Sequence, residues 1–450
     1  MNLKLKVWDA GKLVGELVHD SDLNRFSFAY SRHWVEDGGY PLSPALPLFP
    51  AKDISAERHG ADVRNYFQNL LPEGRALDDA ASMHNISKAN LAGLLHALGR
   101  ESAGALMFTS DTTAPYEKSE VPPRLLANDE LSKRIQARPH DSFTVWDGRL
   151  RLSIAGYQDK LAILQVDGAW FLPESAQHSS THILKPEPVN PQLAGMTTNE
   201  LTCMLLAAAV KLNVAATRLD HVPEPVLVIE RFDREFASPT HHVRRLQCID
   251  GCQLLGLPVD FKYEQPYGNG AEVKNIRGGA SVQRFFELLD NKELMRATGP
   301  AKLGFLRWVI FQVLIGNTDA HAKNVTFFSD STRLALAPAY DLVSGLALID
   351  AHVSDHLAMA IGDNFDPRSV RAYDWALMAH ESKIAPRLVA SELRSLANQC
   401  LKQLPDIRRQ VLEQGGDARM VERVSEVVQD QCRTALSCVD QITAIGPDNF

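Results

Sequence analysis

The spacing of hydrophobic residues changes along the chain, and this change constrains the fold more than any other feature. Over 144–185 apolar residues form short runs separated by polar turns, which predicts antiparallel strands. A helix is expected over 197–213 and one more strand over 226–230, and beyond residue 280 the helical period dominates. This order predicts an α+β chain with two lobes. The first strands are expected at 151–155, 160–166, 169–172 and 181–185.

A smaller module precedes these lobes. Residues 3–18 alternate apolar and polar side chains around Asp9-Ala10-Gly11, which predicts a β-hairpin. Apolar residues at helical spacing follow at 65–71 and 91–98, whereas 110–123 is polar, contains proline and is typical of a linker. We therefore expect an N-terminal α/β module over 1–123, a strand-rich lobe over 124–235 and an all-helical lobe over 236–450.

Composition excludes several classes of protein. Asp and Glu number 55 against 47 Lys and Arg, a formal net charge of −8, so a stand-alone nucleic-acid binder is not expected. The apolar stretches at 201–210 and 305–315 fall short of the roughly 20 residues that span a bilayer, and the N-terminus lacks the apolar core of a signal peptide. Six cysteines without a C-x-x-C pair indicate reduced thiols. We expect a cytoplasmic protein.

The segment from Gly316 to Asn324 carries the sharpest chemical signal. It follows an apolar helix expected over 303–315 and yet is rich in polar and charged residues. Asp319 and Asn324 have the D-x-x-x-x-N spacing of a protein-kinase catalytic loop, in which the Asp accepts a hydroxyl proton and the Asn binds Mg²⁺. Asp341, seventeen residues further on, is suited to complete the magnesium site. The spacing alone is common, and a solvated loop is the alternative.

Phosphoryl transfer also requires cations around the nucleotide phosphates. Lys185 ends an apolar strand, and Glu200 at the start of the next helix is placed to pair with it. Glu200 also has capping-box spacing from Thr197, which explains it equally well. The loop 153–160 lies between expected strands, where its amides and Lys160 are suited to cover phosphates. Taken singly, each has a structural alternative as a strand end, a cap or an ordinary loop.

Two further segments have a functional and a structural interpretation. The strand at 226–230 runs into Arg231 and Phe232, at the position of a hinge between kinase lobes, where backbone groups bind adenine. An ordinary strand end is the alternative. Basic residues and histidines at 241–245 are best explained as a solvated turn, with a partner or DNA contact as the alternative.

Nine short motifs follow one another over nearly the whole chain. With them the chain resembles the HipA family of serine/threonine kinase toxins from bacterial type II toxin–antitoxin modules. The resemblance implies a two-lobed protein-kinase-like fold behind an accessory N-terminal module. The motifs are NYFQNLLPEGR (65–75), LGRESAGAL (98–106), SIAGYQDK (153–160), THILK (181–185), ERFDR (230–234), CQLLGLP (252–258), GNTDAHAKN (316–324), PAYD (338–341) and LAMAIG (357–362).

The resemblance also implies roles for individual residues. Asp319 would be the catalytic base, and Asn324 and Asp341 the Mg²⁺ ligands. Ser153 matches a serine that such kinases autophosphorylate to switch themselves off, and the added negative charge would expel its loop from the ATP site. The residues expected around ATP are Ala155, Gly156, Tyr157, Gln158, Asp159, Lys160, Lys185, Glu230, Arg231, Phe232, His321, Ala322, Lys323 and Tyr340.

The same resemblance implies a biological context. The protein would phosphorylate an aminoacyl-tRNA synthetase, glutamyl or tryptophanyl, and so arrest growth. A HipB-like helix-turn-helix antitoxin would neutralise it as a dimer and would supply the contact with operator DNA. No membrane partner is expected.

Two other functions fit parts of the sequence. A catalytically quiet, antitoxin-bound co-repressor would have no need of the three residues of the expected catalytic and magnesium site. A metal-dependent hydrolase built on Asp319, His321 and Asp341 would leave Lys185 and the loop 153–160 without a function. The kinase interpretation uses all of these residues.

Overall fold

The computed structural model describes residues 3–51, 53–99, 102–110, 114–115, 121–151, 158–237, 242–351 and 354–450. Within these ranges, no helix has both the length and the apolar character that crossing a membrane requires. Several predictions lie outside the described residues: most of the strand expected at 151–155, parts of the expected linker, His241, and the site residues Ser153, Ala155, Gly156 and Tyr157.

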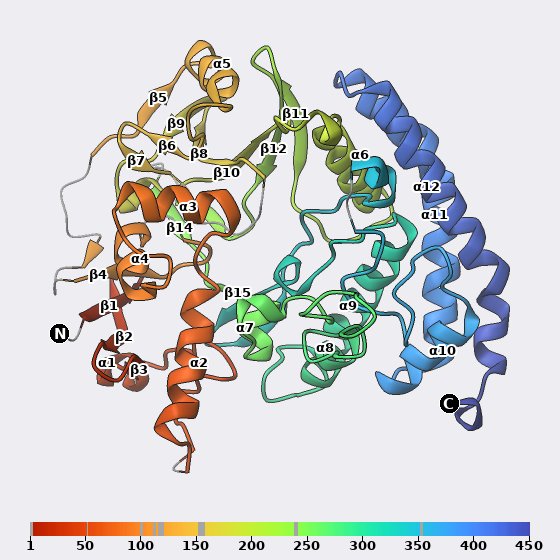
Figure 1. Cartoon of the computed structure of the whole chain (residues 1–450), viewed down its shortest axis with the longest axis horizontal. Helices are drawn as coiled ribbons and strands as arrows, with labels where there is room; N and C mark the ends of the chain where they lie inside the picture. The colour runs from red at the N-terminus through yellow and green to blue at the C-terminus, as the bar shows by residue number, and fades with distance from the viewer. Residues whose placement is uncertain are drawn as a thin grey trace.

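The N-terminal module is built on a four-stranded antiparallel sheet of order β3-β2-β1-β4 (Figure 1). β1 (Leu3–Asp9) and β2 (Lys12–Asp20) form the predicted hairpin, with Gly11 at a φ of 81° in its turn. β3 (Arg25–Tyr30) and β4 (Met107–Thr109) complete the sheet. Its helices are α1 (Arg32–Glu36), α2 (Ala56–Gln68), α3 (Gly74–Met83) and α4 (Leu91–Leu98).

A six-stranded antiparallel sheet of order β11-β12-β10-β8-β9-β5 follows. Helix α6 (Met196–Ala209) connects β10 to β11 and packs against β11 and β12. The helix α5 (Asn128–Ala137) and the short hairpin of β6 (Val145–Trp146) and β7 (Arg149–Leu150) accompany the sheet. The six strands are β5 (Arg124–Leu126), β8 (Leu161–Val166), β9 (Ala169–Leu172), β10 (His182–Pro186), β11 (Thr217–His221) and β12 (Pro225–Glu230).

The expectation of an all-helical chain over 236–450 is wrong, because this part contains a three-stranded antiparallel sheet of order β15-β16-β17. Its central strand is rich in Thr and Phe, residues that favour strands, but it is too short for its periodicity to stand out between helices. A further hairpin lies just before it. The strands are β13 (Arg234–Ala237), β14 (His242–Arg245), β15 (Cys248–Asp250), β16 (Thr326–Asp330) and β17 (Arg333–Leu336).

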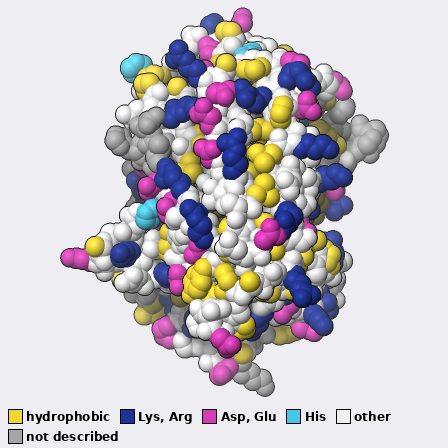
Figure 2. Space-filling view, turned by 90° about the vertical axis from the view of Figure 1, so that its right-hand side faces the viewer, with side chains coloured by type: hydrophobic (Ala, Val, Ile, Leu, Met, Phe, Trp, Pro, Cys, Tyr) yellow, Lys and Arg dark blue, Asp and Glu magenta, His cyan; other side chains and the backbone are white. Residues whose placement is uncertain are grey.

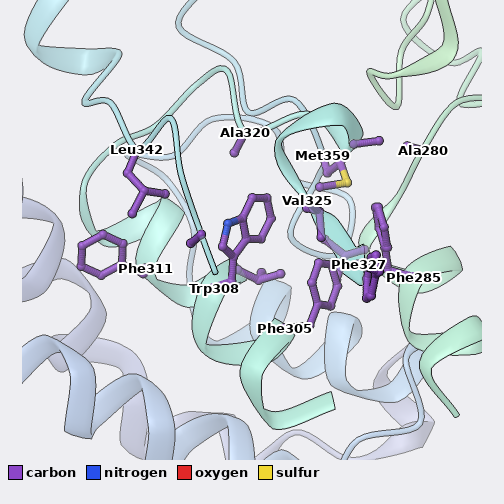
Figure 3. Close-up of a cluster of buried hydrophobic side chains, with 14 of the residues drawn as sticks. Ala280, Phe285, Phe305, Trp308, Phe311, Ala320, Val325, Phe327, Leu342 and Met359 are labelled. Atoms are coloured by element: carbon purple, nitrogen blue, oxygen red, sulfur yellow. The ribbon is translucent and has the colours of Figure 1, made fainter. Parts of the chain in front are cut away.

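A cluster of buried aromatic side chains supports the segment that follows α9 (Thr298–Leu314) (Figure 3). Phe305 stacks on Trp308 with ring centroids 5.6 Å apart, and Phe285 lies 4.9 Å from Phe305. A fully buried Phe contributes about 1.5–3 kcal/mol through the hydrophobic effect. The polar loop after α9 is therefore attached to a buried aromatic part of the core.

Among the remaining helices, α10, α11 and α12 lie on the right of Figure 1, whereas α7 and α8 lie nearer its centre and α7 contacts α2. Both α11 and α12 contact α6 and α9, so they support the helix that carries Glu200 and the helix that precedes the polar loop. On the face to which they contribute, Figure 2 shows Lys and Arg side chains interspersed with Asp and Glu. These helices are α7 (Gly251–Leu255), α8 (Val282–Leu289), α10 (Ala372–Glu381), α11 (Pro386–Glu413) and α12 (Ala418–Cys438).

Candidate active site

A cavity of about 720 Å³ is lined by residues from the N-terminal module, the six-stranded sheet and the C-terminal part of the chain. Its volume lies within the range of roughly 300–1,000 Å³ that is typical of small-molecule sites. Most of the described site residues predicted from the sequence line it together. They are Gln158, Asp159, Lys160, Lys185, Glu230, Arg231, Phe232, Asp319, His321, Lys323, Asn324, Tyr340 and Asp341.

Lys185, near the end of β10, holds two carboxylates from distant parts of the chain. Its Nζ donates to Glu200 Oε1 and Oε2 at 2.8 and 2.9 Å and to Asp341 Oδ1 at 2.5 Å. Burial alone would lower the pKa of Lys185, but the two carboxylates raise it above its ordinary value. The ammonium is therefore charged, and it joins the strand to α6 and to the segment around Asp341.

Glu200 does not cap its helix, so the alternative of a capping box with Thr197 is wrong. Helix α6 begins one residue earlier, at Met196, behind Gly195 at a φ of 86°. Its N-terminus is satisfied by Glu187, whose carboxylate accepts the Met196 N–H at 2.9 Å and the Thr197 hydroxyl at 2.5 Å. Glu200 lies one turn into the helix and is thus available to Lys185.

Asp341 is ionised and its backbone is strained. Its φ of 57° lies in the left-handed region, which side chains other than glycine seldom adopt and which occurs disproportionately at functional sites. Burial would raise the pKa of Asp341, but the charges of Lys185 and Lys160 lower it to about 2. A carboxylate that is ionised at neutral pH is what a divalent cation requires of its ligand.

Asp319 follows α9 and exposes its carboxylate to the cavity. Oδ1 accepts the Tyr263 hydroxyl at 2.6 Å, and the Asp319 N–H donates to Asn317 Oδ1 at 2.9 Å. The protein walls around the carboxylate limit its hydration and raise its pKa, although the hydrogen bond from Tyr263 opposes this shift. A raised pKa is the direction expected of a general base that works near neutral pH.

Asn324 is held close to Asp319. Its Nδ2 donates to the Asp319 carbonyl oxygen at 2.9 Å, so its own side-chain oxygen is the atom suited to bind a cation. His321 is neutral, because burial lowers its pKa to about 3. Ala322 is fully buried and does not line the cavity, and its N–H donates to the Lys262 carbonyl oxygen at 3.0 Å.

Two aromatic rings and the end of β12 form an apolar part of the wall. Phe232 and Tyr340 lie with ring centroids 5.7 Å apart, and both line the cavity. The Tyr340 hydroxyl donates to the Lys323 carbonyl oxygen at 2.6 Å, which fixes this ring against the polar loop. Glu230 extends its exposed side chain from the end of the strand.

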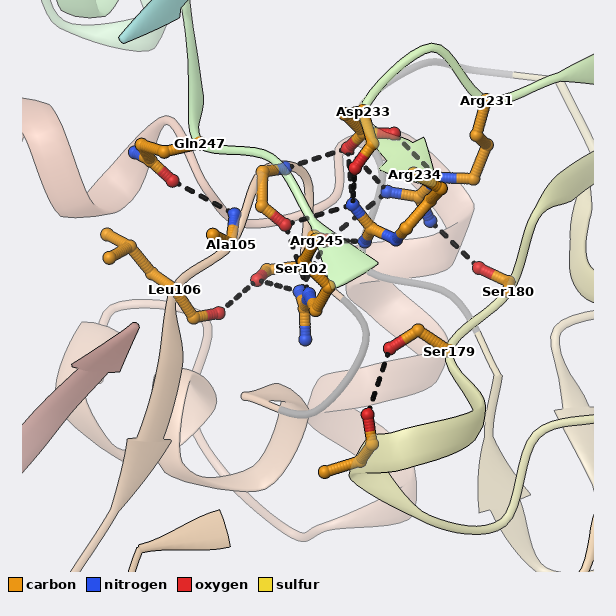
Figure 4. A network of polar contacts seen from close by, with 12 residues as sticks. Ser102, Ala105, Leu106, Ser179, Ser180, Arg231, Asp233, Arg234, Arg245 and Gln247 are labelled. Atoms are coloured by element: carbon orange, nitrogen blue, oxygen red, sulfur yellow. Dashed lines mark hydrogen bonds and ion pairs between the residues drawn. The ribbon is translucent and has the colours of Figure 1, made fainter. Parts of the chain in front are cut away.

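The cationic groups of Arg231 and Lys323 are bound by other residues of the protein. The Arg231 guanidinium donates to Asp233 at 3.0 and 2.8 Å and to Ser180 Oγ at 2.9 Å, within the network that Figure 4 draws. The Lys323 ammonium donates to Asp250 Oδ2 at 2.6 Å. These two side chains organise the walls of the cavity.

Sequence reasoning missed several residues of the cavity. Tyr263 comes from the segment after α7, and the N-terminal module supplies Asn69, Glu73 and Arg75. The motif at 65–75 was a signal for the last three, but it carried no assigned role. These three residues reach the cavity only because the N-terminal module packs against the rest of the chain, and no spacing within the motif indicates that packing.

Comparisons with known proteins identify the family of the chain. Residues 5–109 match the model of the HipA N-terminal domain, and residues 152–406 match that of the HipA-like C-terminal domain. The serine/threonine-protein kinase toxin HipA of Shewanella oneidensis is 32% identical over 434 residues, which are 96% of this chain and 95% of that protein. A putative kinase of Sinorhizobium fredii is 33% identical over 95% of this chain and 94% of its own length.

A solved structure extends the likeness to three dimensions. The chain matches HipA in the complex of Shewanella oneidensis HipA, HipB and operator DNA with a TM-score of 0.85 and 32% identity, covering 98% of this chain and 100% of the other. The match therefore includes the N-terminal module as well as the parts that surround the cavity. The protein is an enzyme that belongs to the HipA family of serine/threonine-protein kinase toxins.

Proposed function

We propose that the protein transfers the γ-phosphoryl group of ATP to a protein hydroxyl in the cavity around Lys185, Asp319 and Asp341. One observation carries this assignment: a charged lysine between two carboxylates shares a cavity with a separate, cavity-exposed carboxylate. Protein kinases require the same two parts, a lysine–glutamate pair that places the phosphates and a carboxylate that receives the acceptor proton.

The residues present fit ATP and Mg²⁺. Phe232 and Tyr340 offer an apolar wall for adenine, and Lys160 and Lys185 offer positive charge for the phosphates. Mg²⁺ is usually held by one or two carboxylates together with substrate phosphates, and Asp341 with the side-chain oxygen of Asn324 supplies such a set. When bound, the metal neutralises charge on the β- and γ-phosphates.

Asp319 acts as the base in this proposal. Its carboxylate accepts the proton of the acceptor hydroxyl while Lys185 holds the nucleotide phosphates in line with that hydroxyl. Tyr263 orients the carboxylate through one oxygen, which leaves the other oxygen for the acceptor. The neutral His321 adds no positive charge that would compete for the carboxylate.

Membership of the family supports a proposal for the regulation and the biological context. We infer that Ser153 is the autophosphorylation site and that its modification expels the 153–160 loop from the cleft. We also infer an aminoacyl-tRNA synthetase, glutamyl or tryptophanyl, as the substrate whose modification arrests growth. A HipB-like antitoxin is the proposed partner, because the Shewanella protein is found with HipB and operator DNA. The proposed parts are a module over 1–123 and two kinase lobes over 124–235 and 236–450.

The replacement Asp319→Asn tests the catalytic assignment. It keeps the size of the side chain and one acceptor for Tyr263 but removes the base, so we expect at least a hundredfold loss of phosphoryl transfer. Phosphoproteomics after induced expression of both forms measures the effect in cells. We expect growth arrest and a phosphorylated synthetase with the unmodified protein only. A variant that still arrests growth and phosphorylates the same target would refute the assignment.

A further inference from the structure

Glu73, from the N-terminal module, lines the cavity next to the expected catalytic loop. It occupies the N-cap position of α3, but its side chain makes no capping hydrogen bond. Only 8% of Glu73 is exposed. Its Oε2 instead accepts the Lys262 ammonium at 2.5 Å, and its Oε1 lies 4.0 Å from the Lys323 ammonium. The carboxylate is therefore turned from its own helix toward two lysines of the C-terminal part.

Both lysines belong to the segments that hold Asp319. The Lys262 carbonyl oxygen accepts the Ala322 N–H at 3.0 Å, and the adjacent Tyr263 donates to Asp319 Oδ1 at 2.6 Å. Lys323 is itself a member of the loop that begins at Asp319. Glu73 therefore binds the Lys262 ammonium directly and lies within ion-pair distance of the Lys323 ammonium, so its charge acts on the loop from two sides.

The segment that carries Glu73 is itself firmly attached. Asn69 accepts the Lys323 ammonium through its carbonyl oxygen at 2.9 Å and its side-chain oxygen at 3.0 Å. Asn69 Nδ2 donates to the Leu257 carbonyl oxygen at 3.0 Å, and Gln253 Nε2 donates to the Tyr66 carbonyl oxygen at 3.1 Å. The motif at 65–75 is therefore joined to the motif at 252–258 by hydrogen bonds in both directions. These bonds hold the backbone that carries Glu73 in one position.

We infer that Glu73 is a positioning residue for the phosphoryl-transfer reaction, and that through Lys262 and Lys323 the N-terminal module holds the Asp319 loop in its productive arrangement. The inference rests on the proposed role of Asp319 and goes beyond it. It makes the accessory module a structural part of the active site. A displacement of about 1 Å at a reacting group is enough to lower the rate of a reaction about a hundredfold. An ion pair that touches no substrate can therefore control the rate of phosphoryl transfer through the position of Asp319.

The test is Glu73→Gln in the full-length kinase, with Glu57→Gln as the matched control. Glu57 is an exposed glutamate in the first turn of α2, in the same module. Release of ADP from Mg-ATP is followed at varied ATP concentration. We expect Glu73→Gln to lower kcat about tenfold to a hundredfold while KM for ATP stays within about threefold, because the lysines around the phosphates keep their places. A kcat within twofold of the control would overturn the inference.

A second variant guards against a simple loss of stability. The double change Glu73→Gln with Lys262→Met removes both buried charges together, which proteins commonly tolerate. If Glu73 acts through Lys262, the double variant unfolds cooperatively and keeps the low kcat of the single variant, so the two effects do not add. A return of kcat to that of the unmodified protein would show that Glu73 only neutralises Lys262, against the inference.

Asp319→Asn, measured in the same assay, separates this inference from the proposed function. If Asp319→Asn is inactive and Glu73→Gln is fully active, only the positioning role fails. If Asp319→Asn keeps its kcat, the assignment of the base fails, and the role of Glu73 fails with it.

Discussion

Four ionisable side chains balance one another around the expected phosphate site. Lys160 and Lys185 bring positive charge, Asp341 brings an ionised carboxylate, and Glu200 is a buried carboxyl whose pKa burial raises and Lys185 lowers. Removing one partner of a buried ion pair costs about 3–5 kcal/mol, because the other charge remains in a medium that solvates it poorly. Burial and the neighbouring Lys185 lower the pKa of Lys160 to about 8, so an anion such as a phosphate beside it would favour its charged form. Because both signs of charge are present, the arrangement is suited to a ligand that brings both signs of charge.

The hydrogen bond from Tyr263 predicts a change in pH dependence. Tyr263→Phe removes a bond that lowers the pKa of Asp319, while burial continues to raise it. The pKa therefore rises further. Since Asp319 must be deprotonated to act as a base, we expect the acidic limb of kcat/KM to move to higher pH and the rate at neutral pH to fall about tenfold.

Tyr267→Phe is the matched control, because Tyr267 is an exposed tyrosine of the same segment and does not line the cavity. Its pH profile should coincide with that of the unmodified protein. An acidic limb that stays in place in Tyr263→Phe, or moves to lower pH, would contradict the role given to this hydroxyl.

At the scale of elements, the start of α6 determines where Glu200 points. Glu187 satisfies the first amides of the helix from outside, so the helix begins at Met196 and its fifth residue faces Lys185. Glu187→Ala removes this cap, and we expect the free energy of unfolding to fall by about 1 kcal/mol. We also expect KM for ATP to rise severalfold, because Glu200 no longer holds Lys185 in one position.

Urea unfolding and ATP titration measure these two effects. Glu426→Ala on α12 is the control, since Glu426 is an exposed glutamate within a helix. If Glu187→Ala lowered the stability and left KM unchanged, the start of α6 would have no part in placing Lys185.

Elements with their own local signals were predictable from the sequence. The N-terminal hairpin, α4 at 91–98 and the strands β8, β9, β10 and β12 are confirmed, because alternation and turn residues are local properties. The strand β11 was not predicted. The short strands β15 to β17 were missed, since three to five residues carry too little periodicity. The cap of α6 was misread because Glu187 lies outside the spacing that a capping box defines.

At the scale of the whole molecule, contacts between distant parts of the chain could not be predicted from the sequence. Lys185 with Glu200 is a contact between neighbouring elements, and the sequence suggested it. Glu73 and Lys262 are 189 positions apart, and no spacing rule connects them. The cavity is therefore a property of the assembled chain, whereas its individual motifs are properties of segments.

Because the cavity joins all three parts of the chain, a ligand that fills it should stabilise the molecule as a whole. ATP alone would bring its phosphates toward Asp341, whose carboxylate is ionised over the whole working pH range. With Mg²⁺ the like charges are bridged. We therefore expect ATP to raise the melting temperature in the presence of Mg²⁺ and to have little effect in EDTA. A ligand that binds only the folded state adds about 2.7 kcal/mol to the free energy of unfolding at 100 times its Kd.

AMP, which lacks the β- and γ-phosphates, serves as control and should give a small shift that is independent of Mg²⁺. Equal shifts by ATP in Mg²⁺ and in EDTA would remove Asp341 and Asn324 from the nucleotide site, and the phosphates would then have to be bound by the lysines alone.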